Sequence, residues 1–265
     1  METVAENVTV KAQTSMQEKV NGIDHQHKGT NGVNCENGTK VVEESTVEKV
    51  QETVGKEAEG ELPKEEVAVE VEAKTGVSFP VKLDDGKQLM SIGLRKKSML
   101  GMGIKIYSFG MYADNEKLKD LMRSKIGKAL GKPTKDMYQE VIDSDAAMMV
   151  RLVIVFSSLT MNMVRKNFDE GLGASIKKLT GGKKNEELTS KVMGAASDDI
   201  KLTTGSVIEI SRLPGYILQT KVMDEVVSKV ESELLCRAYT YMYLGDDPFD
   251  KDAKEKFGMS LLSLF

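Results

Sequence analysis

Two neighbouring segments with strand character constrain the fold of this chain more than any other feature. Residues 93–97 (Gly-Leu-Arg-Lys-Lys) and 104–114 (Ile-Lys-Ile-Tyr-Ser-Phe-Gly-Met-Tyr-Ala-Asp) flank a short glycine-containing break at 100–103. A tight connection there predicts two antiparallel strands, with Arg95 and Tyr107 nearly opposite each other. A guanidinium beside a phenol can bind a carboxylate, because the guanidinium offers paired donors and the phenol adds a third. The other interpretation is a surface charge at a strand end and a tyrosine used for packing.

The charge of the 265-residue chain is unevenly distributed. Residues 1–75 hold 16 Asp and Glu against 8 Lys, whereas the remainder holds 25 acidic and 29 basic residues. The basic residues of this second part do not gather into a cluster, as they would in a nucleic-acid-binding protein. We therefore expect no nucleic-acid partner.

The positions of histidine and cysteine restrict the chemistry of the chain. His25 and His27 both lie near the N-terminus, so residues 75–265 contain no histidine, and Cys35 and Cys236 stand far apart. This excludes Ser-His-Asp and Cys-His catalysis and any His-ligated metal from that region. Two distant cysteines also form no zinc motif or disulfide framework. We expect no metal and no cofactor.

The N-terminal segment differs in composition from the rest. Residues 1–74 are rich in Glu, Lys, Val, Thr and Gly, and they lack the apolar surface that would offset the entropy of ordering. We predict a disordered acidic tail at 1–74, which leaves open a protein partner, and a folded domain at 75–265. Side chains at residues 67–71 follow an alternating pattern, and this segment could form a frayed strand.

The sequence predicts no membrane span, because it has no run of about 18 apolar residues. The tail resembles neither a signal peptide nor a transit peptide. We expect a cytoplasmic protein.

The pattern of elements predicts the α+β class, with an antiparallel-rich sheet covered by helices. We expect strands at 77–83, 89–97, 104–113, 148–156, 206–210 and 216–222. We expect helices at 115–128, 135–142, 160–179, 185–196, from Asp224 onward and from Asp247 onward. Thr160 is the predicted N-cap of the third helix. The helix from Asp224 would turn Val227, Val230, Leu234, Ala238 and Tyr241 inward.

Several strings in this order resemble the chalcone isomerase superfamily, and within it the plant fatty-acid-binding branch. They are the two segments that contain Arg95 and Tyr107, then Leu-Leu-Cys-Arg at 234–237 and Gly-Asp-Asp-Pro-Phe-Asp at 245–250. The resemblance covers residues 75–265 and implies an open-faced β-sandwich, in which helices pack on a large sheet around a ligand cleft. It also implies that the cleft holds a fatty acid, whose carboxylate meets the residues corresponding to Arg95 and Tyr107.

The chain departs from the catalytic members at three positions. True isomerases have a Thr in place of Tyr107, and they have a Tyr and an Asn at or near Met161 and Phe168. Neither Met nor Phe can polarise a carbonyl or orient a water molecule. The resemblance therefore implies a non-catalytic fatty-acid-binding protein. The alternatives are a chalcone–flavanone isomerase, or another intramolecular lyase, and an auxiliary interaction protein of flavonoid or lipid metabolism. Because fatty-acid-binding members are often plastid proteins, the plastid stroma is the alternative location.

The composition agrees with a flexible apolar ligand. The chain has 16 Met but only 5% aromatic residues, and Met side chains adapt to irregular space. Candidate cleft residues are Phe109, Met111, Met161, Met163, Val164, Phe168 and Leu172, for which ordinary core packing is the other interpretation. Arg151 interrupts an apolar strand and needs a partner. It could be a second carboxylate contact, pair with an internal acid or face solvent.

Overall fold

The computed structural model describes residues 68–99, 102–127, 131–183, 185–194, 196–198 and 200–265. Most of the predicted acidic tail, residues 1–67, and the first half of the predicted turn at 100–103 lie outside these ranges. The strand expected within residues 67–71 is present as β1 (Val69–Val71), which pairs with β2 (Ser78–Pro80). This strand lies before residue 75, the predicted start of the folded domain.

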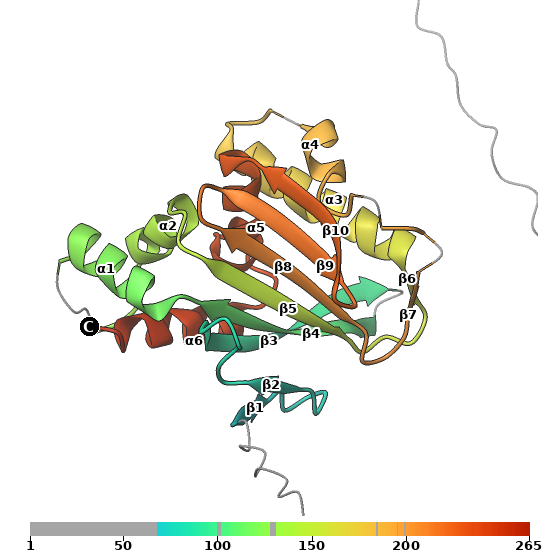
Figure 1. Ribbon diagram of the computed structural model, residues 1–265, viewed down its shortest axis with the longest axis horizontal. Helices are drawn as coiled ribbons and strands as arrows, with labels where there is room; N and C mark the ends of the chain where they lie inside the picture. Colours follow the sequence, from blue (N-terminus) through green and yellow to red (C-terminus); the bar gives the residue numbers. More distant parts are fainter. Residues whose placement is uncertain (1–67, 100–101, 128–130, 184, 195, 199) are drawn as a thin grey trace, which may run out of the picture. The chain divides into compact units, whose positions relative to one another are not determined.

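A six-stranded antiparallel sheet with the order β10-β9-β8-β5-β4-β3 forms the centre of the fold (Figure 1). Its strands are β3 (Gln88–Met99), β4 (Met102–Ala113), β5 (Met148–Ile154), β8 (Val207–Leu213), β9 (Ile217–Val222) and β10 (Glu225–Glu231). The first and last strands of this order are not paired with each other, so the sheet is open. The predicted α+β class with an antiparallel sheet is confirmed.

Helices cover one face of this sheet. They are α1 (Asn115–Lys125), α2 (Lys135–Asp143), α3 (Met161–Leu179), α4 (Glu186–Ser190), α5 (Glu233–Leu244) and α6 (Lys251–Leu262). The helices α3 and α5 pack against each other, and α6 lies along β3. Thr160 caps α3 as predicted, because its side chain accepts a hydrogen bond from the Met163 N–H.

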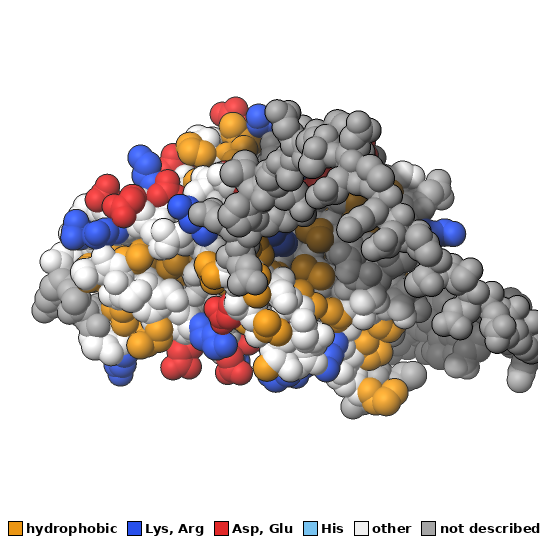
Figure 2. Space-filling view, turned by 60° about the horizontal axis from the view of Figure 1, so that its bottom comes forward, with side chains coloured by type: hydrophobic (Ala, Val, Ile, Leu, Met, Phe, Trp, Pro, Cys, Tyr) orange, Lys and Arg blue, Asp and Glu red, His pale blue; other side chains and the backbone are white. Residues whose placement is uncertain are grey.

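The β3–β4 hairpin shows how sequence alternation assigns side chains to the two faces. Tyr107, Phe109 and Met111 point to the helices and join the main core. Tyr112 belongs to a smaller cluster on the opposite face, beneath Phe79 of the β1–β2 hairpin. A two-stranded sheet of β6 (Leu159–Thr160) and β7 (Lys201–Leu202) completes the fold. Acidic and basic side chains are interspersed on the face shown in Figure 2.

A close approach between elements explains the glycine in the Gly-Leu-Arg-Lys-Lys segment. A Cβ at Gly93 would lie 2.5 Å from the Phe109 ring and 2.6 Å from the side chain of Ala253. Gly93 pairs with Phe109 in the β3–β4 register. The missing side chain therefore lets α6 pack closely against β3, two residues before Arg95.

The helix predicted from Asp224 is wrong over its first part. Residues 225–231 form β10, the edge strand paired with β9, and α5 begins only at Glu233. Met223 and Asp224 have positive φ angles of 48° and 69°, which suits the two central residues of a tight hairpin turn. The helix-like spacing of three residues between Val227 and Val230 thus arose by chance in a strand. The helix predicted at 185–196 is also shorter, since α4 ends at Ser190.

Candidate ligand-binding site

An internal cavity lies between the helix-covered face of the sheet and the helices α3 and α5. Its polar lining residues are Arg95, Lys97, Tyr107 and Asn167. Its apolar walls come from strands (Ile106, Leu152, Ile154, Leu159 and Ile208), from helices (Val164, Phe168 and Met242) and from Phe249. The lining crosses the adjacent strands β3, β4, β5 and β8, a width of about 14 Å at the usual strand spacing.

The sheet places Arg95 and Tyr107 side by side, as the sequence predicted. The two residues are direct partners in the antiparallel register of β3 and β4, and a β-bulge follows Arg95. Both side chains line the cavity. A bulge redirects the strand locally, so Arg95 lies where the register shifts before the pairing continues to Met99.

The guanidinium of Arg95 lies flat on an aromatic ring. Its central carbon is 3.7 Å from the centroid of Phe249. In the described part of the chain, no hydrogen bond or ion pair engages the Arg95 side chain. Stacking uses the face of a guanidinium and leaves its in-plane N–H groups available. Arg95 is therefore a half-buried cation with unused donors at a cavity.

Phe249 is held over Arg95 by the residue that follows it. Asp250 caps α6 by accepting from the Ala253 N–H at 3.1 Å, and its other oxygen accepts from the Leu94 N–H at 3.0 Å. These bonds join the loop between α5 and α6 to β3, next to Arg95. The aromatic platform is thus part of the fold rather than a loose loop contact.

Tyr107 is a buried phenol that stays neutral. Burial raises its pKa well above the ordinary value, the neighbouring Tyr243 phenol raises it further, and the Arg95 guanidinium opposes part of this rise. The side chain is only 6% exposed. A neutral phenol donates a hydrogen bond to an anion, so Tyr107 supplies a donor beside Arg95.

The two other polar lining residues are engaged with each other. Lys97 donates from Nζ to Oδ1 of Asn167 at 2.7 Å and forms an ion pair with Glu170 at 3.3 Å. The Asn167 amide donates to the backbone carbonyl of Met163 at 2.7 Å. Their polar groups are therefore satisfied within the protein, in contrast to Arg95.

The predicted apolar cleft residues divide into two groups. Val164 and Phe168 line the cavity. The other five do not line the cavity. Four are buried in the main core, namely Phe109, Met111, Met161 and Leu172, and Met163 is partly buried against that core. Sequence reasoning missed the wall residues on β5 and β8, as well as Met242 and Phe249. The apolar run at 148–156 predicted a buried strand, but nothing in it marked Leu152 and Ile154 as cavity residues.

Arg151 lies away from this cavity. Its Nη2 is 2.7 Å from Oε1 of Glu209, its Nε donates to the same oxygen at 2.8 Å, and its guanidinium stands over the Tyr112 ring at 5.8 Å. Tyr112 belongs to the cluster on the opposite face of the sheet. The structure does not bring Arg151 to Arg95 and Tyr107. It supports the alternative expectation of a pair with an internal acid.

The cavity is narrow and joins a wider groove at the surface. Its interior leaves only about 20 Å³ to the centre of a water molecule, close to what one water needs. The adjoining groove offers about 450 Å³ and shares Arg95, Asn167, Met242 and Phe249 with the cavity. The unpaired guanidinium thus lies where the inner cavity meets the outer groove.

None of the helices in the described residues combines the length and apolar character that crossing a bilayer requires. No cluster of three or more His, Cys, Asp or Glu side chains among the described residues could hold a metal ion.

Comparison with known proteins identifies the family. The chalcone isomerase-like family model matches residues 72–257. Chalcone isomerase-like protein 1 of Humulus lupulus is 62% identical over 200 residues, which cover 75% of this chain and 94% of that protein. Fatty-acid-binding protein 1 of Arabidopsis thaliana is 37% identical over 191 residues, or 71% of this chain and 68% of that protein. The chain therefore belongs to the chalcone isomerase-like family.

The fold agrees with this assignment. A crystal structure of an Arabidopsis thaliana fatty-acid-binding protein matches with a TM-score of 0.67 and 36% sequence identity. The match covers 74% of this chain and 98% of that chain. The predicted chalcone isomerase-like fold is confirmed.

Proposed function

We propose that this chalcone isomerase-like protein binds a free fatty acid, with the carboxylate on the Arg95 guanidinium and the Tyr107 hydroxyl. The observation that carries the proposal is the unpaired guanidinium at the entrance to a cavity with mainly apolar walls. The Arabidopsis relatives are named fatty-acid-binding proteins. This supports a fatty acid as the ligand here.

The apolar walls and the polar anchor would contribute differently to binding. Burying each methylene of an acyl chain contributes about 0.8 kcal/mol, so the chain supplies most of the affinity. Arg95 and Tyr107 determine the orientation, because a carboxylate accepts strong charge-assisted hydrogen bonds and is strongly disfavoured among apolar groups. The expected ligand has its carboxylate at the entrance and its chain across β4, β5 and β8.

Ligand entry requires the cavity to widen. An acyl chain needs far more room than the space of about 20 Å³ described above. Met242 and Phe249 line both the cavity and the outer groove, and a Met side chain changes shape readily. We expect these two side chains to move apart when the ligand enters.

We expect the protein to lack chalcone isomerase activity. Ring closure needs groups that polarise a carbonyl and position water. Met161 and Phe168, at or near polar positions of the isomerases, are buried apolar residues. Asn167, the neighbour of Phe168, is occupied by Lys97 and the Met163 carbonyl. The remaining polar pair suits binding of an anion rather than catalysis.

Native mass spectrometry of the purified chain with added laurate tests the proposal. We expect one laurate per wild-type chain and a complex about tenfold weaker or more for Arg95→Met, because a hydrogen bond to a charged group contributes about 1.5–3 kcal/mol. Arg123→Met, an exposed position on α1, is the matched control and should bind like the wild type. No complex with laurate or longer fatty acids would contradict the proposal. Turnover of a chalcone would favour the isomerase alternative.

A further inference from the structure

Two tyrosines of α5 have buried hydroxyl groups without a regular hydrogen bond. The side chains of Tyr239 and Tyr243 are each 2% exposed, and among the described residues neither hydroxyl makes a hydrogen bond of regular geometry, although the two phenols lie close enough to each other and to Tyr107 to interact. Residues four apart share one face of a helix. A buried polar group without a partner destabilises the fold, so two such groups on one helix face require an explanation.

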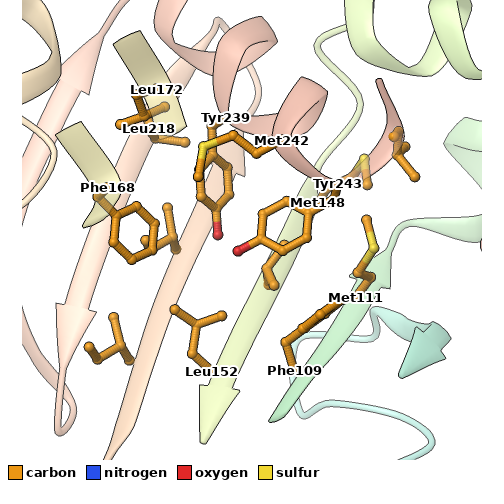
Figure 3. Packing of buried hydrophobic residues seen from close by; sticks show 14 of the residues in the cluster. Phe109, Met111, Met148, Leu152, Phe168, Leu172, Leu218, Tyr239, Met242 and Tyr243 are labelled. Carbon is orange, nitrogen blue, oxygen red and sulfur yellow. The ribbon is translucent and has the colours of Figure 1, made fainter. Parts of the chain in front are cut away.

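Both hydroxyls point towards side chains of the cavity wall, although Tyr239 and Tyr243 do not themselves line the cavity. Figure 3 shows the oxygens of Tyr239 and Tyr243 directed towards each other and towards Leu152 of β5, with Phe168 beside Tyr239. The rings of Phe168 and Tyr239 are stacked, with centroids 6.4 Å apart. Because Leu152 and Phe168 line the cavity, the two hydroxyls face its wall.

Ring contacts connect these tyrosines to the Arg95 anchor. The ring of Tyr243 lies 5.5 Å from that of Tyr239 and 5.4 Å from that of Phe249. Phe249 is the platform on which Arg95 lies. The pKa of Tyr243 is raised well above its ordinary value by burial and by Tyr239, while Tyr107 and Arg95 lower it. Arg95 and the three phenols therefore lie close enough to affect one another.

A carboxylate can satisfy this cluster. An ionised carboxylate accepts at about four lone-pair sites. A bidentate guanidinium fills two of them and Tyr107 a third, which leaves one site for another donor. We propose that Tyr243 donates a hydrogen bond to the ligand carboxylate alongside Arg95 and Tyr107, and that Tyr239 positions Tyr243 by donating to its oxygen. This inference rests on the proposed function, since it names further residues of the same fatty-acid site.

The proposal predicts opposite effects on stability and affinity. Tyr243→Phe removes a buried hydroxyl that makes no hydrogen bond of regular geometry in the ligand-free protein, so the melting temperature should stay equal or rise. The same change should lower laurate affinity about tenfold or more, as expected for a hydrogen bond to a charged group. Tyr239→Phe should lower the affinity about threefold, because it acts through Tyr243.

Tyr138→Phe is the matched control. The Tyr138 hydroxyl is also in a buried side chain, but it donates to the Lys254 carbonyl at 3.0 Å on α6. Removing a hydroxyl that already has a partner should lower the melting temperature and leave laurate affinity unchanged. The two variants therefore separate a hydroxyl kept for the ligand from one that stabilises the fold.

The experiment is calorimetric titration of the full-length chain with laurate and with methyl laurate, with thermal unfolding of the ligand-free proteins. A loss of laurate affinity in Tyr243→Phe, without loss of stability or of methyl laurate affinity, supports the proposal. Unchanged laurate affinity, or an equal loss for both ligands, overturns it while fatty-acid binding stands. A wild-type chain that binds neither ligand overturns this inference together with the proposed function.

Discussion

Arg212 and Arg95 both place a guanidinium on the helix-covered side of the same sheet, but their surroundings are opposite. Arg212 of β8 is 1% exposed, and it donates from Nε to the Ala146 carbonyl at 2.8 Å and from Nη1 to the Val141 carbonyl at 3.0 Å. The same Nη1 also lies within hydrogen-bond distance of the Ile142 carbonyl and the Thr240 hydroxyl. Arg95 has no such bond among the described residues.

The contrast separates a structural cation from a cation available to a ligand. Arg212 meets the C-terminal end of α2, where carbonyls lack helical partners and the helix dipole favours a positive charge. Burial lowers the pKa of Arg212 to about 10, so the group is still charged at neutral pH. The fold uses its donors completely. The Arg95 donors remain unused and face a cavity, which is the basis of the proposed carboxylate site.

The largest expected effect comes from Arg212→Leu. This change leaves the carbonyls of Val141, Ile142 and Ala146 without their donor, and hydrogen bonds to charged groups contribute about 1.5–3 kcal/mol each. We expect the free energy of unfolding, measured in denaturant, to fall by about 3 kcal/mol or more. The matched variant Arg95→Leu should lose less than about 1 kcal/mol. Equal losses would remove the distinction between the two arginines.

Phe249→Ala tests the platform beneath Arg95. A cation–π contact contributes about 0.5–2 kcal/mol, so fatty-acid affinity should fall about 3- to 30-fold. Phe249→Tyr keeps the aromatic face and should retain the affinity. Competition with a fluorescent fatty acid measures both variants. If Phe249→Ala binds as tightly as the wild type, the stacked arrangement does not serve the ligand.

Arg151→Gln extends the comparison to an arginine that is paired with an acid. Its partner Glu209 is 8% exposed and would lose its counter-ion, so we expect a loss of about 1 kcal/mol in the free energy of unfolding. Fatty-acid affinity should not change, because this pair lies on the other face of the sheet. A tenfold fall in affinity would show that Arg151 reaches the ligand after all.

The smallest expected effect is that of pH on binding. The pKa of Tyr107 is raised well above its ordinary value by burial, so its hydroxyl keeps its proton and laurate affinity should be constant between about pH 6 and 9. Burial also raises the pKa of Cys236 from 9.0 to about 12. Because the Cys236 thiol keeps its proton to a higher pH in the folded than in the unfolded chain, its contribution to the free energy of unfolding is fully present below pH 9 and is lost as pH rises towards 12. Affinity that declines between pH 7 and 9 would contradict the assignment of Tyr107 as a neutral donor.

The sequence predicted the pairing of Arg95 with Tyr107 because its signal is local. Arg95 and Tyr107 lie on strands joined by one tight connection, so the alternation of the two strands placed them opposite each other. Phe249 comes from the far end of the chain, and no local pattern reports that its ring lies on Arg95. Tertiary packing decides that contact, through the hydrogen bond between Leu94 and Asp250.

The two α5 tyrosines were missed for a different reason. The helix was predicted to begin at Asp224, which assigned Leu234 and Tyr241 to its inward face. With the helix beginning at Glu233, Tyr239 and Tyr243 are among its buried residues, as is Ala238, which had been expected to face inward, whereas Leu234 and Tyr241 are only partly buried. Periodicity gives the spacing of the residues on one face of a helix. Which residues form the buried face cannot be assigned correctly when the first residue of the helix is wrong.

The cavity walls could be predicted only in part. Helical spacing identified Val164 and Phe168 as inward-facing, and both line the cavity. The same reasoning chose Met161 and Leu172, which are fully buried but lie in the packed core. A sequence pattern identifies which side chains are buried. Where packing leaves a gap depends on the shapes of residues from several elements, and no single segment contains that information.

The central claim is that Arg95 recognises the charge of the ligand, and a thermodynamic cycle tests it most directly. Laurate and its neutral analogue methyl laurate would each be titrated into the wild type and into Arg95→Met. We predict that the wild type prefers laurate by about tenfold or more and that Arg95→Met loses this preference while still binding the ester. A preference for laurate that persists in Arg95→Met would contradict the account and place the carboxylate elsewhere.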